Sequence, residues 1–208
     1  MMFRIISLLL ITLIGYSFWS FNHVPSRVRK DLTAELTEIL ADKQLGKVLI
    51  VYYSLDGNTH NVAMRIQQMT GADVFEIETL EPYPSAPAYF WKAWRDLKGL
   101  PKIKTPIPDI NEYDLIIVGS PAWFYTVSAP VLSFLEKRDF NGKVVVPFVT
   151  HGGNIGSFFK DFREKAQNAK VVDGVDFKKI WNVAPKDLNE KISTWLEKTK
   201  EIDPKSFL

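Results

Sequence analysis

Six consecutive apolar residues, Val48 to Tyr53, are followed at once by a polar loop, residues 54–59, and then by a change of period. A run of β-branched and aromatic residues with no polar position is typical of a strand buried on both faces of a sheet. From His60 onward, apolar residues recur at helical spacing. A buried strand that leads through a glycine-containing loop into a helix presents free backbone N–H groups to an anion. We therefore expect residues 54–59 to hold a phosphate group.

Strands and helices alternate along the rest of the chain. Further strands are predicted at about residues 72–77, 114–119, 143–150 and 170–177, and helices at about 58–69, 88–98 and 128–137, from about 158, and at about 187–200. Strand–helix–strand crossovers imply parallel pairing, with helices on both faces of the sheet. The expected fold class is therefore α/β, an open five-stranded parallel sheet in the order 2-1-3-4-5.

The N-terminal segment is strongly apolar and carries no charge between residues 5 and 21. In a helix these 17 residues would span about 26 Å, which is just short of the hydrocarbon core of a bilayer. We expect residues 1–22 to form one uncleaved transmembrane helix. A cleaved signal peptide is the alternative, because Gly15 and Ser17 could form a small-residue cleavage site.

Positive charges are more numerous after this segment (Arg27, Arg29 and Lys30) than before it (Arg4). This bias predicts a single-pass membrane protein whose C-terminal domain lies in the cytoplasm. Residues 23–46 have helical spacing and are expected to form a linker helix, which either lies on the membrane surface or packs on the domain. The domain itself is expected to comprise residues 47–208.

Residues 80–111 interrupt the alternation and contain six of the twelve prolines in the chain. The short helix predicted within them carries four aromatic residues, Tyr89, Phe90, Trp91 and Trp94. An insertion of this length is usually functional. The aromatic side chains are expected either to form a lid over a ligand or to pack against the domain.

Three loops follow the carboxyl ends of strands that would be neighbours in this sheet order, and ligands bind at that edge of an open parallel sheet. The loop at 54–59 offers anion-binding amides, the loop at 120–126 offers aromatic faces, and the loop at 151–157 offers a glycine backbone that can approach a ligand closely. A phosphate, a planar ring and hydrogen bonds to the ring edge together describe flavin mononucleotide (FMN). The expected FMN-binding residues are Ser54, Leu55, Asp56, Gly57, Asn58, Thr59, Pro121, Ala122, Trp123, Phe124, Tyr125, Thr150, His151, Gly152 and Gly153.

Four motifs in order carry a family resemblance: VYYSxxGNT at 51–59, EPYP at 81–84, GxPxW at 119–123 and FxTHGG at 148–153. The chain from about residue 47 to 177 resembles a flavodoxin-like domain of the flavodoxin/NAD(P)H-quinone reductase superfamily. The resemblance implies non-covalently bound FMN, with its phosphate on residues 54–59. It also implies that residues 121–125 lie beside the isoalloxazine ring and that residues 151–153 lie at its polar edge.

Asp56 departs from this family pattern, which usually has Thr, Ser or Arg at this position. A carboxylate repels a phosphate and cannot donate a hydrogen bond to it. Either Asp56 points into solvent or caps the following helix, or the phosphate site is weaker than usual; we expect the first, because the backbone donors and Gly57, Asn58 and Thr59 remain. His151 is expected either to donate to the flavin or a substrate, or to bond only to backbone.

The function expected is an FMN-dependent oxidoreductase, tethered to the membrane, that uses NAD(P)H to reduce quinone-like acceptors. No acid–base catalytic residue is required, because the flavin supplies the redox chemistry. The alternatives are a one-electron flavodoxin for a protein partner and a cofactor-free, membrane-tethered interaction module. Residues 47–208 contain 21 Lys or Arg and 20 Asp or Glu, which disfavours electrostatic docking to a basic redox partner. With no cysteine, three histidines and a net charge of +2, neither a metal site nor nucleic-acid binding is expected.

Overall fold

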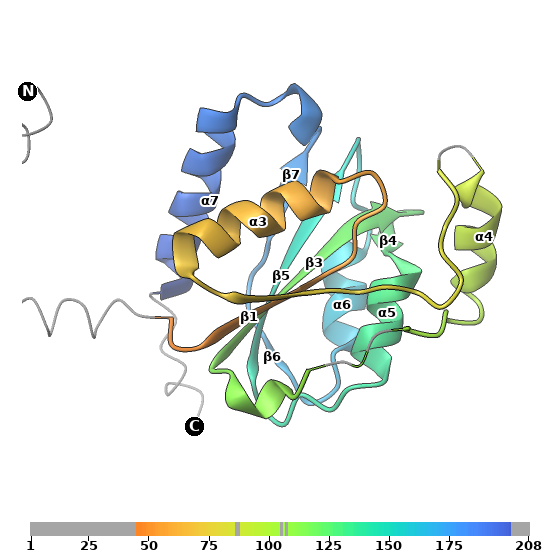
Figure 1. The fold of residues 1–208 in the computed structure, drawn as a ribbon, viewed down its shortest axis with the longest axis horizontal. Helices are drawn as coiled ribbons and strands as arrows, with labels where there is room; N and C mark the ends of the chain where they lie inside the picture. The colour runs from red at the N-terminus through yellow and green to blue at the C-terminus, as the bar shows by residue number, and fades with distance from the viewer. Residues whose placement is uncertain (1–44, 86–87, 105, 107, 201–208) are drawn as a thin grey trace, which may run out of the picture. The chain divides into compact units, whose positions relative to one another are not determined.

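The computed structural model describes residues 45–200, apart from residues 86, 87, 105 and 107. Strands and helices alternate along this part of the chain, as the sequence predicts (Figure 1). The elements are β1 (Val48–Tyr52), α3 (Asn58–Thr70), β2 (Asp73–Glu76), α4 (Tyr89–Asp96), η1 (Ile110–Glu112), β3 (Leu115–Trp123), β4 (Thr126–Val127), α5 (Ala129–Glu136), β5 (Val144–His151), α6 (Phe158–Lys165), β6 (Lys170–Val171), β7 (Val175–Lys178), η2 (Ile180–Asn182) and α7 (Pro185–Lys200).

The strands form one sheet in the order β2-β1-β3-β5-β6, with β7 also paired to β5 and β4 paired to β3. The β1–β2, β1–β3, β3–β5, β5–β6 and β5–β7 pairings are parallel. The predicted order 2-1-3-4-5 is therefore confirmed, but the count of five strands is wrong. The last predicted strand is divided into β6 and β7. The break lies opposite Pro147, which has no N–H to donate to a neighbouring strand.

Two apolar cores cover the two faces of the sheet, because the side chains of a strand alternate in direction. In β1, Leu49 and Val51 belong to one core and Val48 and Ile50 to the other. The first core includes the apolar faces of α5 and α6, and the second includes those of α3 and α7 (Figure 1). Helices on both faces leave the ends of the central strands open to a ligand.

The prediction of a loop at residues 120–126 is wrong in its first half. Strand β3 continues to Trp123, and its parallel pairing with β5 extends as far as Pro121 opposite Thr150. It then reverses through Phe124 and Tyr125 into β4, so that Trp123 pairs with Thr126. The strand persists because β5 pairs with it as far as Pro121 and β4 pairs with its last two residues, although the sequence Gly-Ser-Pro is typical of turns.

The predicted membrane anchor (residues 1–22) and nearly all of the predicted linker (residues 23–46) lie outside the described residues. Within the part of the chain that is described, no helix has both the length and the apolar character needed to cross a bilayer.

Gly119 allows the two central strands to pack closely. A Cβ atom at this position would lie 2.1 Å from the ring of Phe148, which is its partner residue on β5 and is fully buried. A contact this short cannot be accommodated without moving the ring or the strand.

We therefore expect Gly119→Ala to lower the free energy of unfolding by about 1–3 kcal/mol, the usual cost of overpacking a core. Gly99→Ala is the matched control, because nothing lies within 4 Å of a Cβ built on Gly99. Urea denaturation of both variants measures the difference. Equal stability of the two variants would contradict the steric argument.

Candidate functional site

A pocket of about 220 Å³ lies at the carboxyl ends of β1, β3 and β5, where ligands bind in open parallel sheets. The three loops singled out from the sequence all contribute to its wall. The residues that line it are Ser54, Leu55, Asp56, Asn58, Thr59, Tyr89, Pro121, Ala122, Trp123, Thr150, His151, Gly152, Phe177, Ile180 and Trp181.

The N-terminus of α3 forms one end of this pocket. Gly57 caps the helix with a φ of 80°, in the left-handed region that glycine enters at little cost, and no side chain caps the helix end. The first bond of the helix runs from the Asn61 N–H to the Gly57 carbonyl, at 2.9 Å. The N–H groups of residues 58–60 come before it and have no partner within the helix. Together with the helix dipole, they favour an anion at this point.

Two buried polar atoms in the pocket wall have no hydrogen-bond partner among the described residues. They are the hydroxyl oxygen of Ser54 and Nδ1 of His151. Burying a polar group without a partner costs free energy, and such groups are normally satisfied. Both residues line the pocket, so a polar ligand bound there is the partner that the described residues do not provide.

His151 is held by Asp176 of β7. Its Nε2 lies 3.1 Å from an Asp176 carboxylate oxygen, and the His151 side chain is only 7% exposed. Burial of the Asp176 carboxyl opposes its ionisation, but the His151 hydrogen bond and the nearby Lys191 hold the pKa of Asp176 below its ordinary value. An ionised Asp176 accepts a hydrogen bond from the Nε2–H group of His151. Nδ1 is then an acceptor in the neutral ring and a donor in the protonated ring.

The wall opposite the helix N-terminus is aromatic. Trp123 is 5% exposed and packs against Tyr53, Tyr83 and Tyr89, with ring centroids 5.5, 4.9 and 5.4 Å away. Burial is the main reason that the pKa values of Tyr53 and Tyr83 are raised, so both hydroxyls stay protonated. The cluster fixes Trp123 as a rigid side of the pocket.

The structure brings together eleven of the fifteen residues predicted for the site, and the other four do not line the pocket. Gly57 shapes the loop only through its backbone, and Gly153 lies beyond the wall. Phe124 turns away and packs on Phe90 and Trp94 of α4, and Tyr125 is exposed. The hairpin reverses the chain after Trp123 and so leaves this aromatic pair out of the pocket wall, and their contact with FMN stays a prediction.

Asp56 is exposed at the edge of the pocket, as one of the two expectations had it. The other expectation, that it caps α3, is wrong, since Gly57 is the capping residue and no side chain bonds to the helix end.

Sequence reasoning missed four pocket residues, Tyr89, Phe177, Ile180 and Trp181, as site residues. The sequence predicts Tyr89 either as part of a lid or as packed against the domain, and of the four aromatic residues in that segment it alone lines the pocket. Ile180 and Trp181 form the short helix η2 after β7, whose end lies beside His151: the Lys179 N–H donates to the His151 carbonyl at 2.8 Å. The position of residues 178–183 after a predicted strand end was the signal that could have found them.

The helix N-terminus and the end of β5 are joined by one buried hydrogen bond. The hydroxyl oxygens of Thr59 and Thr150 lie 2.8 Å apart, and the two residues are 1% and 4% exposed. This bond couples the first and third loops of the site.

We expect Thr59→Val and Thr150→Val each to lower the free energy of unfolding by about 1–3 kcal/mol, because each leaves one buried hydroxyl unpaired. The double variant removes both hydroxyls and should cost less than the two single variants together. A double-mutant cycle in urea measures the coupling. Strict additivity would contradict the proposed link.

Comparison with known proteins places this geometry in context. Residues 47–199 match the model of the family described as flavodoxin. Among solved structures, a flavoprotein from Lactobacillus acidophilus NCFM in complex with FMN is 27% identical, with a TM-score of 0.58, and the match covers 63% of this chain and 93% of that one.

Among curated proteins, Flavodoxin 1 of Escherichia coli is 28% identical over 48% of this chain and 46% of its own length. An NAD(P)H dehydrogenase (quinone) from Cupriavidus metallidurans is 30% identical over 55% of this chain and 63% of its own length. The chain thus spans about half to two thirds of these curated relatives. The family match covers the whole described sheet and every loop of the pocket, and the chain belongs to the flavodoxin family.

Proposed function

We propose that this protein is an FMN-binding oxidoreductase that passes electrons from NAD(P)H to quinone-like acceptors. The observation that carries the proposal is the pocket itself, which combines an uncapped helix N-terminus, a rigid aromatic wall and two unpartnered buried polar atoms. The FMN bound by the Lactobacillus acidophilus flavoprotein supports the cofactor, and the Cupriavidus metallidurans quinone dehydrogenase supports the class of acceptor.

The residues present fit FMN. The N–H groups at the start of α3 would bind its phosphate, with the Ser54 hydroxyl as a further donor. Pro121, Ala122 and Trp123 would lie beside the ring system, and His151 and Gly152 would meet its polar edge. FMN, when bound, supplies the redox chemistry, and the protein controls its orientation and its access to water.

His151 and Asp176 can hold a proton at the pocket wall. Asp176 fixes the orientation of the imidazole through Nε2, and this leaves Nδ1 to give or take one hydrogen bond inside the pocket. Two-electron reduction of a quinone-like acceptor also consumes protons. We therefore assign His151 as the residue that contacts the bound groups and Asp176 as the residue that positions it.

The proposal includes a membrane tether. The uncharged apolar segment at residues 5–21 and the three basic residues that follow it favour a single-pass anchor with the domain at 47–208 on the cytoplasmic side. An anchored flavin domain would work near lipid-soluble acceptors such as quinones.

Purification of the full chain in detergent, followed by a visible spectrum before and after addition of excess FMN, tests the cofactor. Flavin absorption that remains with the protein after gel filtration supports the proposal, and a colourless folded protein overturns it in favour of a cofactor-free interaction module. NADPH oxidation that depends on an added quinone supports the acceptor class. Reduction by dithionite in separate one-electron steps, without NADPH turnover, would instead indicate an electron carrier for a protein partner.

The exposed carboxylate of Asp56 provides a sharper test of where the phosphate lies. We expect Asp56→Thr to tighten FMN binding by roughly 1.5- to 5-fold at low salt, since one exposed charge contributes about 0.2–1 kcal/mol. The gain should shrink at high salt because the repulsion is screened.

Riboflavin, which lacks the phosphate, is the matched ligand control for this variant. Its dissociation constant should be the same for Asp56→Thr and the wild type, as measured by fluorescence titration. An equal gain for both ligands, or no gain for FMN, would place the phosphate away from residues 54–59.

A further inference from the structure

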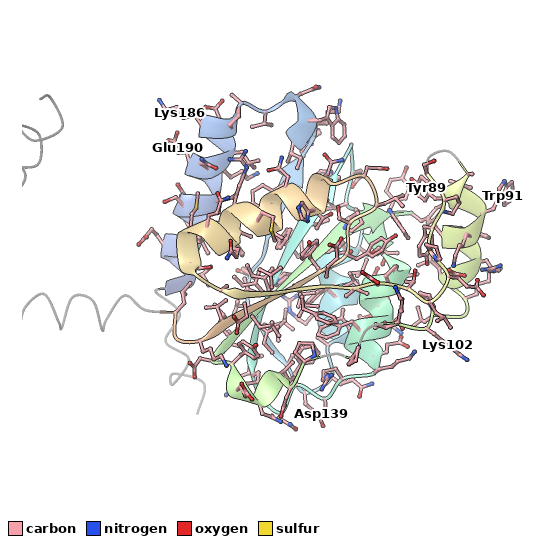
Figure 2. The ribbon with its side chains drawn as sticks, in the orientation of Figure 1. Tyr89, Trp91, Lys102, Asp139, Lys186 and Glu190 are labelled. Carbon is pink, nitrogen blue, oxygen red and sulfur yellow. The ribbon has the colours of Figure 1, made fainter. Side chains whose placement is uncertain are left out.

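Helix α4 presents its aromatic residues to solvent. Trp91 is 77% exposed, and Phe90 and Trp94 are each 48% exposed. Figure 2 shows Trp91 on the outer side of α4. We call Phe90, Trp91 and Trp94 the aromatic patch. Such a cluster of exposed aromatic residues on one helix is unusual. Contiguous exposed apolar surface in a folded protein generally marks an interaction site.

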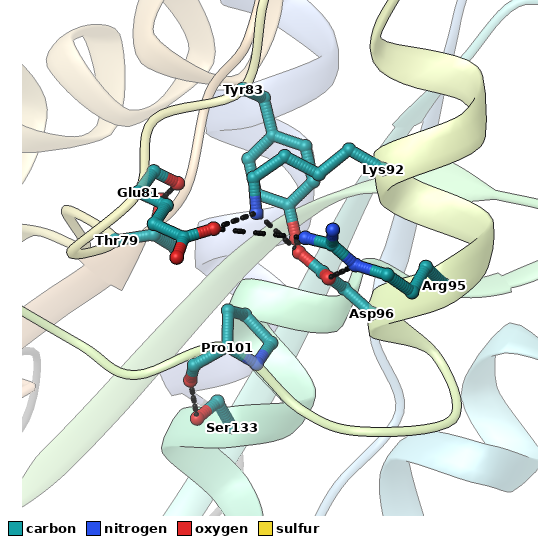
Figure 3. Close-up of polar contacts among 8 residues, drawn as sticks. All are labelled: Thr79, Glu81, Tyr83, Lys92, Arg95, Asp96, Pro101 and Ser133. Carbon is teal, nitrogen blue, oxygen red and sulfur yellow. Dashed lines mark hydrogen bonds and ion pairs between the residues drawn. The ribbon is translucent and has the colours of Figure 1, made fainter.

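One acidic residue of α4 is buried instead, and two basic residues of the helix reach it from the surface. Asp96 is only 4% exposed and accepts hydrogen bonds from the Tyr83 hydroxyl, at 2.8 Å, and from Lys92 and Arg95 (Figure 3). Glu81 adds weaker ion pairs to both basic side chains, at 4.0 and 3.7 Å. Although burial alone would raise it, these hydrogen bonds hold the pKa of Asp96 below its ordinary value.

The buried face of α4 therefore combines Asp96 with small or partly buried apolar residues, Ala93 among them. The three largest apolar residues lie outside it, whereas a surface helix usually turns such residues to the core. A charge network centred on the buried Asp96 anchors α4 to the preceding loop. Phe90 and Trp94 make one further contact, with Phe124, and remain half exposed. Figure 3 shows that Lys92, Arg95 and Asp96 converge on the side of the helix that faces Tyr83. The charge network around Asp96 orients the helix so that the aromatic patch is exposed. This orientation is fixed in the free protein.

Basic residues surround the aromatic patch. Residues 88–104 contain five Lys or Arg and one acidic residue, the buried Asp96. Lys98 lies over the Trp94 ring, 5.7 Å from its centroid, and Lys102 is exposed. Neither lysine forms an ion pair with any described residue. Lys104 is paired with Glu78 at 2.9 Å, so the unpaired positive charges of this segment are those of Lys98 and Lys102.

We propose that α4 is an interfacial helix that lies on an anionic lipid bilayer, with the aromatic patch inserted at the level of the headgroups. Trp and Phe beside Lys and Arg are the combination that binds the boundary between headgroups and acyl chains. Anionic lipids complement the lysines. The uncharged apolar run at residues 5–21 in the same chain favours a bilayer over a protein partner as the occupant.

The proposal has a consequence for the pocket but does not depend on FMN. Tyr89, the first residue of α4, lines the pocket, and Phe124 packs on Phe90 and Trp94 at 4.8 and 5.4 Å. The aromatic patch is thus continuous with the side of the pocket formed by β3. A helix bound to lipid would hold that side of the pocket near the membrane surface.

Depth measurement with a spin label tests the docking directly, because the chain has no cysteine and a single introduced one is labelled uniquely. The full chain is reconstituted without FMN into vesicles of phosphatidylcholine with and without phosphatidylglycerol. One label is placed by Trp91→Cys and a control label by Lys160→Cys on α6, where the side chain is 74% exposed.

On anionic vesicles, the label at residue 91 should be more accessible to oxygen than to a polar nickel chelate, and the label at residue 160 should show the reverse. Water-like accessibility at both positions would overturn the proposal even if the N-terminal segment anchors the chain. Dipolar broadening between labels at residue 91 would also overturn it, since it would identify a second copy of the chain as the occupant.

Charge reversal tests whether Lys98 and Lys102 contribute to binding of anionic lipid. Lys98→Glu together with Lys102→Glu should lower the lipid-docked population of the label at residue 91 by at least about tenfold, because each lysine near an anionic surface contributes several-fold in affinity. Lys160→Glu together with Lys186→Glu changes the net charge equally on α6 and α7 and should leave the docked population unchanged. Equal losses from the two pairs would overturn the proposed local contact.

Discussion

Parallel hydrogen bonding among β1, β3 and β5 is the constraint on which the pocket depends. These strands pair in a continuous register from Val48 opposite Leu115 to Pro121 opposite Thr150, so their carboxyl ends reach the same edge of the sheet. Because helices cover both faces, the loops at this edge are left to surround a ligand. The close approach of Gly119 to Phe148 and the Thr59–Thr150 hydrogen bond keep those ends together.

Much of the fold could be predicted from local sequence patterns. Continuous apolar runs such as Val48–Tyr52 identified the central strands, and Gly57 followed by Asn58 marked the start of α3 correctly. The failures came from long-range effects. Pro147 on one strand divides its neighbour into β6 and β7, and β5 extends β3 through Pro121. No local pattern carries that information.

The site was predictable to the extent that it consists of loop residues directly after strands. Eleven of the predicted residues meet in the pocket, and the expectation of FMN agrees with the family and with its FMN-bound relative. The orientation of α4 could not be predicted, because aromatic residues and charges share the helix and the aromatic ones are usually assigned to the core. Tertiary contacts, among them the hydrogen bond from Tyr83 to Asp96 and the core packing of Ala93, decide which face is buried.

The turn after Trp123 has a consequence for how this protein can be altered. Its two central residues, Phe124 and Tyr125, both have positive φ, of 50° and 66°, where glycine or asparagine is usual. Their strain is offset by the packing of Phe124 on α4 and by the Ser157 N–H, which donates to the Tyr125 carbonyl at 2.9 Å. The proline-rich insertion at residues 80–111 is consequently not an independent module. If it were exchanged for that of a homologue, the β3–β4 hairpin would lose the packing of Phe124 on α4. Both segments must therefore be transplanted together.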